Sequence, residues 1–250
     1  MMNEFKLLRH QGFNNMTKET VDALMPLWLQ NIKRPTLKAA SYDRLESTIN
    51  NHIPPALGSY AVTQLATETI QVELINKMQA DALSYSSVKK AYDALNDFLR
   101  YLTARRTIMY NPMQLVSKPT KVNFETADVV PLSDEDVRKL IDGCRLEYKT
   151  KNRRYPMGEA FILILNTGMR MGEALALRWG DVDMEKGTLC INKNLILVKN
   201  RKDGEPNYIL KVQNNPKTQS GVRIVRLNEA AKSAVPAPNR TAGQRILGRG

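Results

Sequence analysis

The run Leu165-Asn-Thr-Gly-Met-Arg-Met-Gly-Glu-Ala-Leu-Ala-Leu-Arg-Trp-Gly-Asp-Val-Asp183 contains the most informative residues of the chain. Gly168 and Gly172 bracket Arg170, and glycine lets the backbone bend tightly on either side of that arginine. Arg170 and Glu173 are three residues apart, so on a helix they share a face, where the carboxylate can hold the guanidinium. A guanidinium held at a helix start is well suited to a phosphate. A purely structural Arg–Glu pair explains the same residues equally well.

Helix signals precede this run and strand signals follow it. Ser133 is expected to cap a helix with an acidic first turn. A second helix is expected over residues 157–165, and a short third one over residues 170–177. Short β-branched and apolar runs then predict a small antiparallel sheet with a hairpin tip near residues 217–221. These runs are residues 188–191, 195–198, 208–212 and 223–227.

Four amphipathic helical patterns lie upstream. Their expected N-caps are Thr17, Thr36, Thr67 and Ser84. Ile53-Pro-Pro-Ala-Leu-Gly58 predicts a corner, because two prolines remove backbone donors. The patterns predict a helical domain over residues 17–110, a linker over 111–131, a second domain over 132–232 and an atypical tail over 233–250. The expected fold class is mainly α with a small antiparallel β-sheet (α+β).

The composition favours an anionic partner and excludes several classes of protein. Lys and Arg number 37 against 25 Asp and Glu, a net charge of +12, which favours nucleic acid binding, although a merely solvated basic surface is the alternative. The longest apolar stretch, residues 160–165, is far shorter than the roughly 20 residues that span a bilayer, so no membrane contact is expected. Cys144 and Cys190 are distant in sequence from each other and from His10 and His52. We therefore expect no metal site, no disulfide framework and a cytoplasmic location.

Residues 167–183 resemble the first active-site box of the tyrosine recombinases, also called phage integrases. Asn215-Pro-Lys-Thr-Gln-Ser-Gly-Val-Arg-Ile-Val-Arg-Leu227 is similar to the hairpin that carries this family's active-site lysine, here Lys217. Residues 28–112 resemble its helical core-binding domain. Taken together, these three matches cover nearly the whole chain up to about residue 231. It implies a recombinase of a mobile element, such as a phage, that breaks and rejoins double-stranded DNA through a 3′-phosphotyrosine. No cofactor is implied, and a homo-oligomer on DNA is expected.

The resemblance also implies roles for three residues. Arg170 would hold the phosphate, Glu173 would orient the site, and Lys217 would act as general acid. The family pattern continues with a His-x-x-Arg box and a nucleophilic tyrosine, but neither follows Lys217 in this sequence. The last tyrosine is Tyr208, inside a predicted strand, where a packed or edge-strand position explains it better than a nucleophile does.

The residues after position 232 bear on the same departure from the family. Val235-Pro-Ala-Pro238 is expected to stop the next helix, and the residues beyond it have no apolar periodicity. We expect that a frameshift near residue 233 truncated the reading frame. The product would then be an integrase remnant that is inactive by itself. The alternative is a short, non-catalytic DNA-binding protein that occupies attachment sites.

Candidate DNA contacts in the first domain are basic side chains and hydroxyls near helix ends, which commonly face phosphates. They are Arg34, Thr36, Lys38, Ser86, Ser87, Lys89, Lys90 and Arg105. A solvated surface position explains any one of them alone. Together they predict DNA binding that weakens steeply with salt.

Overall fold

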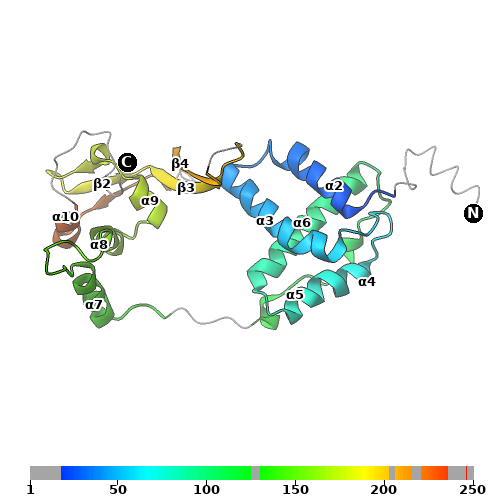
Figure 1. The fold of residues 1–250 in the computed structure, drawn as a ribbon, viewed down its shortest axis with the longest axis horizontal. Coiled ribbons are helices and arrows are strands. Elements are labelled where there is room, and N and C mark those ends of the chain that lie inside the picture. Colours follow the sequence, from blue (N-terminus) through cyan, green and yellow to red (C-terminus); the bar gives the residue numbers. More distant parts are fainter. Residues whose placement is uncertain (1–17, 125–129, 203–205, 215–220, 236–245, 247–250) are drawn as a thin grey trace, which may run out of the picture. The chain divides into compact units, whose positions relative to one another are not determined.

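The computed structural model describes residues 18–124, 130–202, 206–214, 221–235 and 246. The chain divides between residues 128 and 129 into two compact units. Figure 1 shows that helices dominate the described residues and that the strands are short. The predicted fold class, mainly α with a small antiparallel β component, is confirmed.

Among the described residues of the first unit are four helical segments, and two short 3-10 turns follow them (Figure 1). The elements are α2 (Val21–Trp28) continued by η1 (Leu29–Lys33), α3 (Ala39–Leu57), α4 (Thr67–Ile70) continued by η2 (Gln71–Asn76) and α5 (Lys77–Ala80), α6 (Tyr85–Ala104), η3 (Pro112–Gln114) and η4 (Lys121–Asn123). Their apolar faces enclose one core, in which Met25, Ile53, Leu74 and Phe98 are fully buried. Met113 and Val116 join this core, so the first part of the expected linker packs on the first unit.

The predicted N-caps of the first and last of these helical segments have different outcomes. Ser84 caps α6 as predicted, because its Oγ accepts a hydrogen bond from the Ser87 amide at 3.3 Å. Thr17 lies outside the described residues. The cap of α2 is Thr20, whose Oγ1 accepts a hydrogen bond from the Ala23 amide at 3.3 Å.

The other two predicted N-caps, Thr36 and Thr67, are wrong. The Thr36 hydroxyl donates to the carbonyl of Lys33 at 3.0 Å, so it caps the end of the preceding helix instead of the start of α3. Thr67 is the first residue of α4, and its hydroxyl donates to the carbonyl of Pro112 at 3.0 Å. A threonine can satisfy carbonyls as well as amides, and the sequence alone does not distinguish the two.

The predicted corner at residues 53–58 is also wrong, because α3 continues through Pro54 and Pro55 to Leu57. The helix closes with a hydrogen bond of 2.9 Å from the Gly58 amide to the Pro54 carbonyl. Both prolines lie in the last turn, where they remove only two intrahelical donors. Ile53 and Leu57 are fully buried in the core, and their packing outweighs that loss.

Among its described residues the second unit contains four α-helices, one 3-10 turn (η5) and five short strands. They are α7 (Asp134–Cys144), α8 (Gly158–Thr167), α9 (Met171–Ala176), η5 (Trp179–Asp181), β1 (Val182–Asp183), β2 (Thr188–Ile191), β3 (Lys193–Lys199), β4 (Tyr208–Asn214), β5 (Arg223–Arg226) and α10 (Glu229–Ala234). The predicted cap at Ser133 is confirmed as a reciprocal capping box, since its Oγ accepts from the Asp136 amide at 3.2 Å and the Asp136 carboxylate accepts from the Ser133 amide at 3.3 Å.

The described strands form two antiparallel sheets, whereas one was predicted. In the first sheet β2 lies between β1 and β5, and in the second β3 pairs with β4. A hairpin joining β4 directly to β5 is therefore wrong as a pairing. The predicted tip falls mainly on residues 215–220, which lie outside the described residues. β5 joins β2 because Leu189 and Val225 lie opposite each other on the face that packs against the core of this unit.

The last described residues of the second unit are those of α10, Val235 and Ile246. Asn228 caps α10 by accepting a hydrogen bond from the Ala231 amide at 2.8 Å, and the helix ends at Ala234, where the sequence predicted a stop. Ile246 is buried in the same core, and its amide donates to the Leu177 carbonyl at 3.0 Å. In the parts of the chain that the structure describes, no helix is both long and apolar enough to cross a membrane.

Candidate functional site

The backbone around Arg170 is shaped by two glycines. Gly168 ends α8 in the left-handed region, with φ of +63°, a conformation that glycine adopts without strain. Arg170 is extended and forms the N-cap of α9. A Cβ on Gly172 would lie 2.7 Å from the carbonyl oxygen of Leu195 and would overlap the side chain of Asn194, so glycine allows α9 to approach β3 closely.

Glu173 lies between two arginines. Its Oε1 accepts hydrogen bonds from Arg170 Nη1 at 3.0 Å and from Arg223 Nη1 at 3.2 Å. Its Oε2 accepts from the Arg170 backbone amide at 2.9 Å and from Arg223 Nη2 at 2.8 Å. The carboxylate therefore caps its own helix, holds the Arg170 side chain and binds β5 in a two-pronged ion pair.

The two arginines of this trio differ in exposure. The Glu173 side chain is only 6% exposed and the Arg223 side chain is 30% exposed, whereas the Arg170 side chain is 79% exposed. Burial raises the pKa of Glu173, but hydrogen bonds from Arg223 and then from Arg170 outweigh burial, so its pKa is lowered from the ordinary value. The Glu173 carboxylate is thus ionised at neutral pH, and it holds the Arg170 guanidinium, which is exposed to solvent.

Sequence reasoning identified Arg170 and Glu173 but missed Arg223. Arg223 is 50 residues from Glu173, and it was included only as the first residue of a predicted strand. Side chains alternate between the faces of a strand, so Arg223 shares the inner face with Val225. Because Ile224 and Val225 are both apolar, the sequence does not show which of them faces the core. Ile224 turns out to be 72% exposed, which leaves an arginine pointing inward.

The candidates in the first unit lie at three places, and Lys217 lies outside the described residues. Arg34, Thr36 and Lys38 are exposed between η1 and α3, four more candidates are in the first turns of α6, and Arg105 follows α6. Lys89 pairs with Asp93, and Arg105 donates to the Tyr101 hydroxyl at 2.7 Å. The four in α6 are Ser86, Ser87, Lys89 and Lys90.

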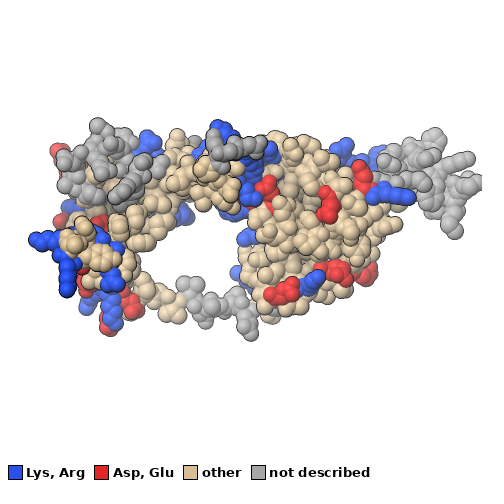
Figure 2. All heavy atoms as spheres, in the orientation of Figure 1, with Lys and Arg blue, Asp and Glu red and all other residues tan. Residues whose placement is uncertain are grey.

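Surface charge is mixed on the face of each unit that Figure 2 shows. Lys and Arg occur at many points of both units, but Asp and Glu are interspersed with them instead of leaving one uninterrupted basic face. Lys33, for example, pairs with Asp97 and also lies 5.0 Å from the centre of the Trp28 ring. On the face shown, the net positive charge therefore does not single out a binding surface.

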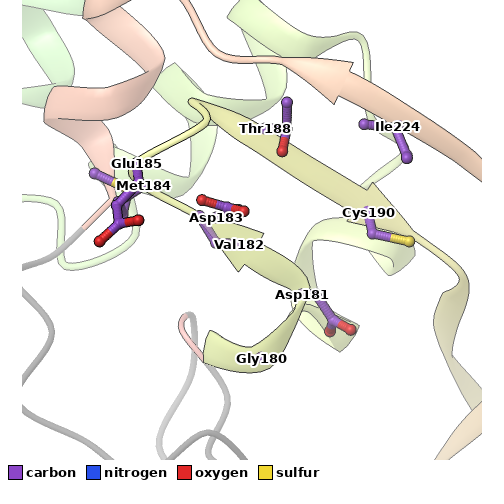
Figure 3. A pocket seen from close by; sticks show the side chains of 9 residues that line it. All are labelled: Gly180, Asp181, Val182, Asp183, Met184, Glu185, Thr188, Cys190 and Ile224. Atoms are coloured by element: carbon purple, nitrogen blue, oxygen red, sulfur yellow. The ribbon is translucent and has the colours of Figure 1, made fainter.

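A pocket of about 450 Å³ lies on the other face of the β1-β2-β5 sheet from Arg223 (Figure 3). Ile224 and Cys190, which pair across β5 and β2, line it, so it is separate from the Glu173 trio. Two of the three carboxylates that line it, those of Asp181 and Asp183, form ion pairs within the fold. Asp181 bonds to Lys193 Nζ at 2.6 Å, and Asp183 bonds to Lys186 Nζ at 3.1 Å.

No group of three or more potential metal ligands occurs among the residues that the structure describes. Cys144 and Cys190 are free thiols, and burial raises the pKa of Cys144. In the trio of Arg170, Glu173 and Arg223, an exposed guanidinium is bound to a buried carboxylate that accepts four hydrogen bonds.

Two family models match the chain, one in each unit. The model of the phage integrase N-terminal SAM-like domain matches residues 20–79, and that of the phage integrase family matches residues 131–234, which include the whole Glu173 trio. The chain belongs to the phage integrase family of tyrosine recombinases. The predicted resemblance is confirmed.

Named relatives of this family are similar over most of the chain. It is 24% identical to a tyrosine recombinase XerC-like protein of Caldanaerobacter subterraneus subsp. tengcongensis, over 82% of this chain and 51% of that protein. It is 25% identical to an integrase of Saccharopolyspora erythraea, over 76% of this chain and 42% of that protein. The chain thus spans about half the length of these relatives.

Solved integrase structures share the fold. The Tn1549 transposon integrase in complex with a circular intermediate DNA has a TM-score of 0.64 at 21% identity, over 87% of this chain and 64% of that one. A λ integrase tetramer bound to a Holliday junction has a TM-score of 0.57 at 17% identity, over 82% of this chain and 53% of that one.

Proposed function

We propose that this chain binds double-stranded DNA and that Arg170 holds a backbone phosphate. The single observation that carries the proposal is the exposed Arg170 guanidinium, which is hydrogen-bonded to the buried, ionised carboxylate of Glu173. A guanidinium whose orientation is set before binding loses less entropy when it engages two phosphate oxygens. The relatives named above are a tyrosine recombinase XerC-like protein and an integrase, and the λ and Tn1549 structures contain DNA, which supports a DNA phosphate as the ligand.

Within this proposal the other residues have separate tasks. Glu173 orients Arg170, and Lys217, six residues before Arg223 in the sequence, is the general acid that would protonate the leaving 5′-oxygen. The candidate residues between η1 and α3, in α6 and at Arg105 contact the DNA backbone. We further propose that the protein acts in the cytoplasm, that copies assemble on DNA, and that binding needs no metal or cofactor.

Strand cleavage would need a nucleophile that these 250 residues do not offer in the family's position. No tyrosine and no histidine follows Lys217, and Tyr208 lies in β4. The alternative proposal is a non-catalytic protein that occupies attachment sites. The observation that favours it is that Arg170, Glu173 and Arg223 provide binding and orientation but no attacking group.

The test uses duplex DNA from the flanks of the protein's own gene. Affinity is measured at several salt concentrations for the wild type, Arg170→Ala and the control Arg226→Ala, which removes an exposed charge from β5 of the same unit. Loss of a charge-assisted contact should weaken binding by about tenfold, and the dependence of log K on log salt should fall by about 0.9, one phosphate contact. Equal effects of the two substitutions would overturn the role of Arg170.

A second readout separates binding from cleavage. A nicked suicide duplex is incubated with the wild-type chain, and covalent complexes are detected on a denaturing gel. Salt-sensitive binding without a covalent band supports the non-catalytic alternative for this chain. A covalent band would show that one of its own residues is a nucleophile and would refute that alternative.

A further inference from the structure

We propose that Arg223 is a positioning residue for the phosphate site: it binds Glu173 from β5 and thereby keeps Arg170 oriented and electropositive. This inference rests on the proposed function, in which Arg170 holds a DNA phosphate. Arg223 acts through Glu173 and does not itself contact the DNA.

The first support is the saturation of the Glu173 carboxylate. Its two oxygens have about four acceptor sites, and four hydrogen bonds occupy them, two from Arg170 and two from Arg223. Without Arg223, half of these bonds would be missing from a side chain that is 6% exposed. A buried carboxylate in that state would have to move toward solvent or take a proton, and either change would release Arg170.

The second support is the charge of the site. One arginine and one glutamate alone form a neutral pair, which has little attraction for a phosphate. With Arg223 the trio carries two positive charges and one negative charge, a net charge of +1. The positive charge is also directed outward, because Arg223 is mostly covered while Arg170 is mostly exposed.

The third support is that the two arginines come from different elements. Arg170 precedes α9, and Arg223 begins β5, whose partner β2 belongs to the core of the second unit. The Arg223–Glu173 ion pair therefore ties the short helix α9, six residues long, to a sheet. A helix this short is only marginally stable alone, so an anchor from the sheet limits the motion of the arginine at its start.

The experiment is a double-mutant cycle on DNA affinity. It compares the wild type, Arg170→Ala, Arg223→Met and the double variant, with Arg226→Met as the matched control from the same strand. Arg223→Met should weaken binding about tenfold when Arg170 is present and should cause no further loss when Arg170 is alanine. Arg223→Lys, which keeps the charge but loses the two-pronged geometry, should restore part of the affinity.

Two results would overturn this inference. One is a loss in Arg223→Met no greater than in Arg226→Met, and the other is a full additional loss in the Arg170→Ala background, which would indicate that Arg223 contacts DNA or only stabilises the fold. Circular dichroism checks folding, and Arg223→Lys provides the comparison if Arg223→Met does not fold.

A DNA-free measurement distinguishes failure of this inference from failure of the proposed function. NMR of the Arg170 side chain reports the rate of rotation of its guanidinium. Rotation should be slow in the wild type and in Arg226→Met, faster in Arg223→Lys and fastest in Arg223→Met. Unchanged rotation would refute positioning, whereas changed rotation together with unaffected DNA binding in Arg170→Ala would refute the phosphate site alone.

Discussion

Glu173→Gln tests the structural account of the site most directly, because it preserves the shape of the side chain while removing its charge and one acceptor oxygen. The amide keeps one acceptor oxygen but places an NH2 group where Oε2 accepts from the Arg170 amide and Arg223 Nη2. Two hydrogen bonds involving the carboxylate are lost, at about 1.5–3 kcal/mol each when a charged group takes part. Water can reach Arg170, and Arg223 in part, so we discount this sum and expect a loss of about 2–4 kcal/mol.

Urea unfolding of the second unit measures this loss. The two tryptophans are Trp28 in the core of the first unit and Trp179 against the core of the second. In a Trp28→Phe background, fluorescence therefore follows the second unit alone. Glu185→Gln, which removes an exposed carboxylate, is the control and should change stability by less than about 0.5 kcal/mol.

Three outcomes of this measurement are informative. A midpoint shift at constant m-value indicates a change in stability, while a changed m-value indicates a change in the unfolded or folded ensemble. A loss of less than about 0.5 kcal/mol for Glu173→Gln, equal to the control, would refute the view that the ionised carboxylate holds α9 and β5 together.

Three further predictions concern the contact at Gly172, the titration of Glu173 and the helix cap at Ser133. Gly172→Ala should destabilise the second unit by about 1–3 kcal/mol in urea unfolding, since the new methyl group meets the Leu195 carbonyl, whereas Gly143→Ala, with open space around it, should be neutral or slightly stabilising. The lowered pKa of Glu173 means that its contribution to stability is present above the unfolded pKa, about 4.3, and is lost as pH falls through the folded pKa. Acid titration of stability should therefore be less steep below about pH 4 in Glu173→Gln, and identical profiles would contradict this. Ser133→Ala should cost about 1 kcal/mol and speed amide exchange at the start of α7, and unchanged exchange would refute the capping box.

Features encoded within one helical turn were predictable from the sequence. The caps at Ser84 and Ser133 depend on residues three positions away, and so does the Arg170–Glu173 pair. The same limit explains the errors. The hydroxyl of a threonine such as Thr36 can bond to the end of the helix before it or to the start of the helix after it. Only the fold decides which of the two helices it caps.

Features that depend on distant residues were not predictable in this way. The continuation of α3 through Pro54 depends on how well Ile53 is buried by other helices. Arg223 reaches Glu173 only because β5 pairs with β2 in one of two possible orientations, and consecutive apolar residues in the strand leave that orientation open. Local pattern thus predicted part of the proposed phosphate site, namely Arg170 and Glu173, whereas the ion pair of Glu173 with Arg223 could be seen only in the fold.

The threefold use of Glu173 has an evolutionary consequence. One carboxylate begins a helix, neutralises a covered arginine and orients an exposed one, so selection for a folded protein is enough to retain Glu173, Arg223 and Gly172. Arg170 contributes least to that fold because its side chain faces water. In a lineage released from DNA chemistry, Arg170 should therefore be the first of these residues to drift, and its identity in related genes would record whether the chemistry is still under selection.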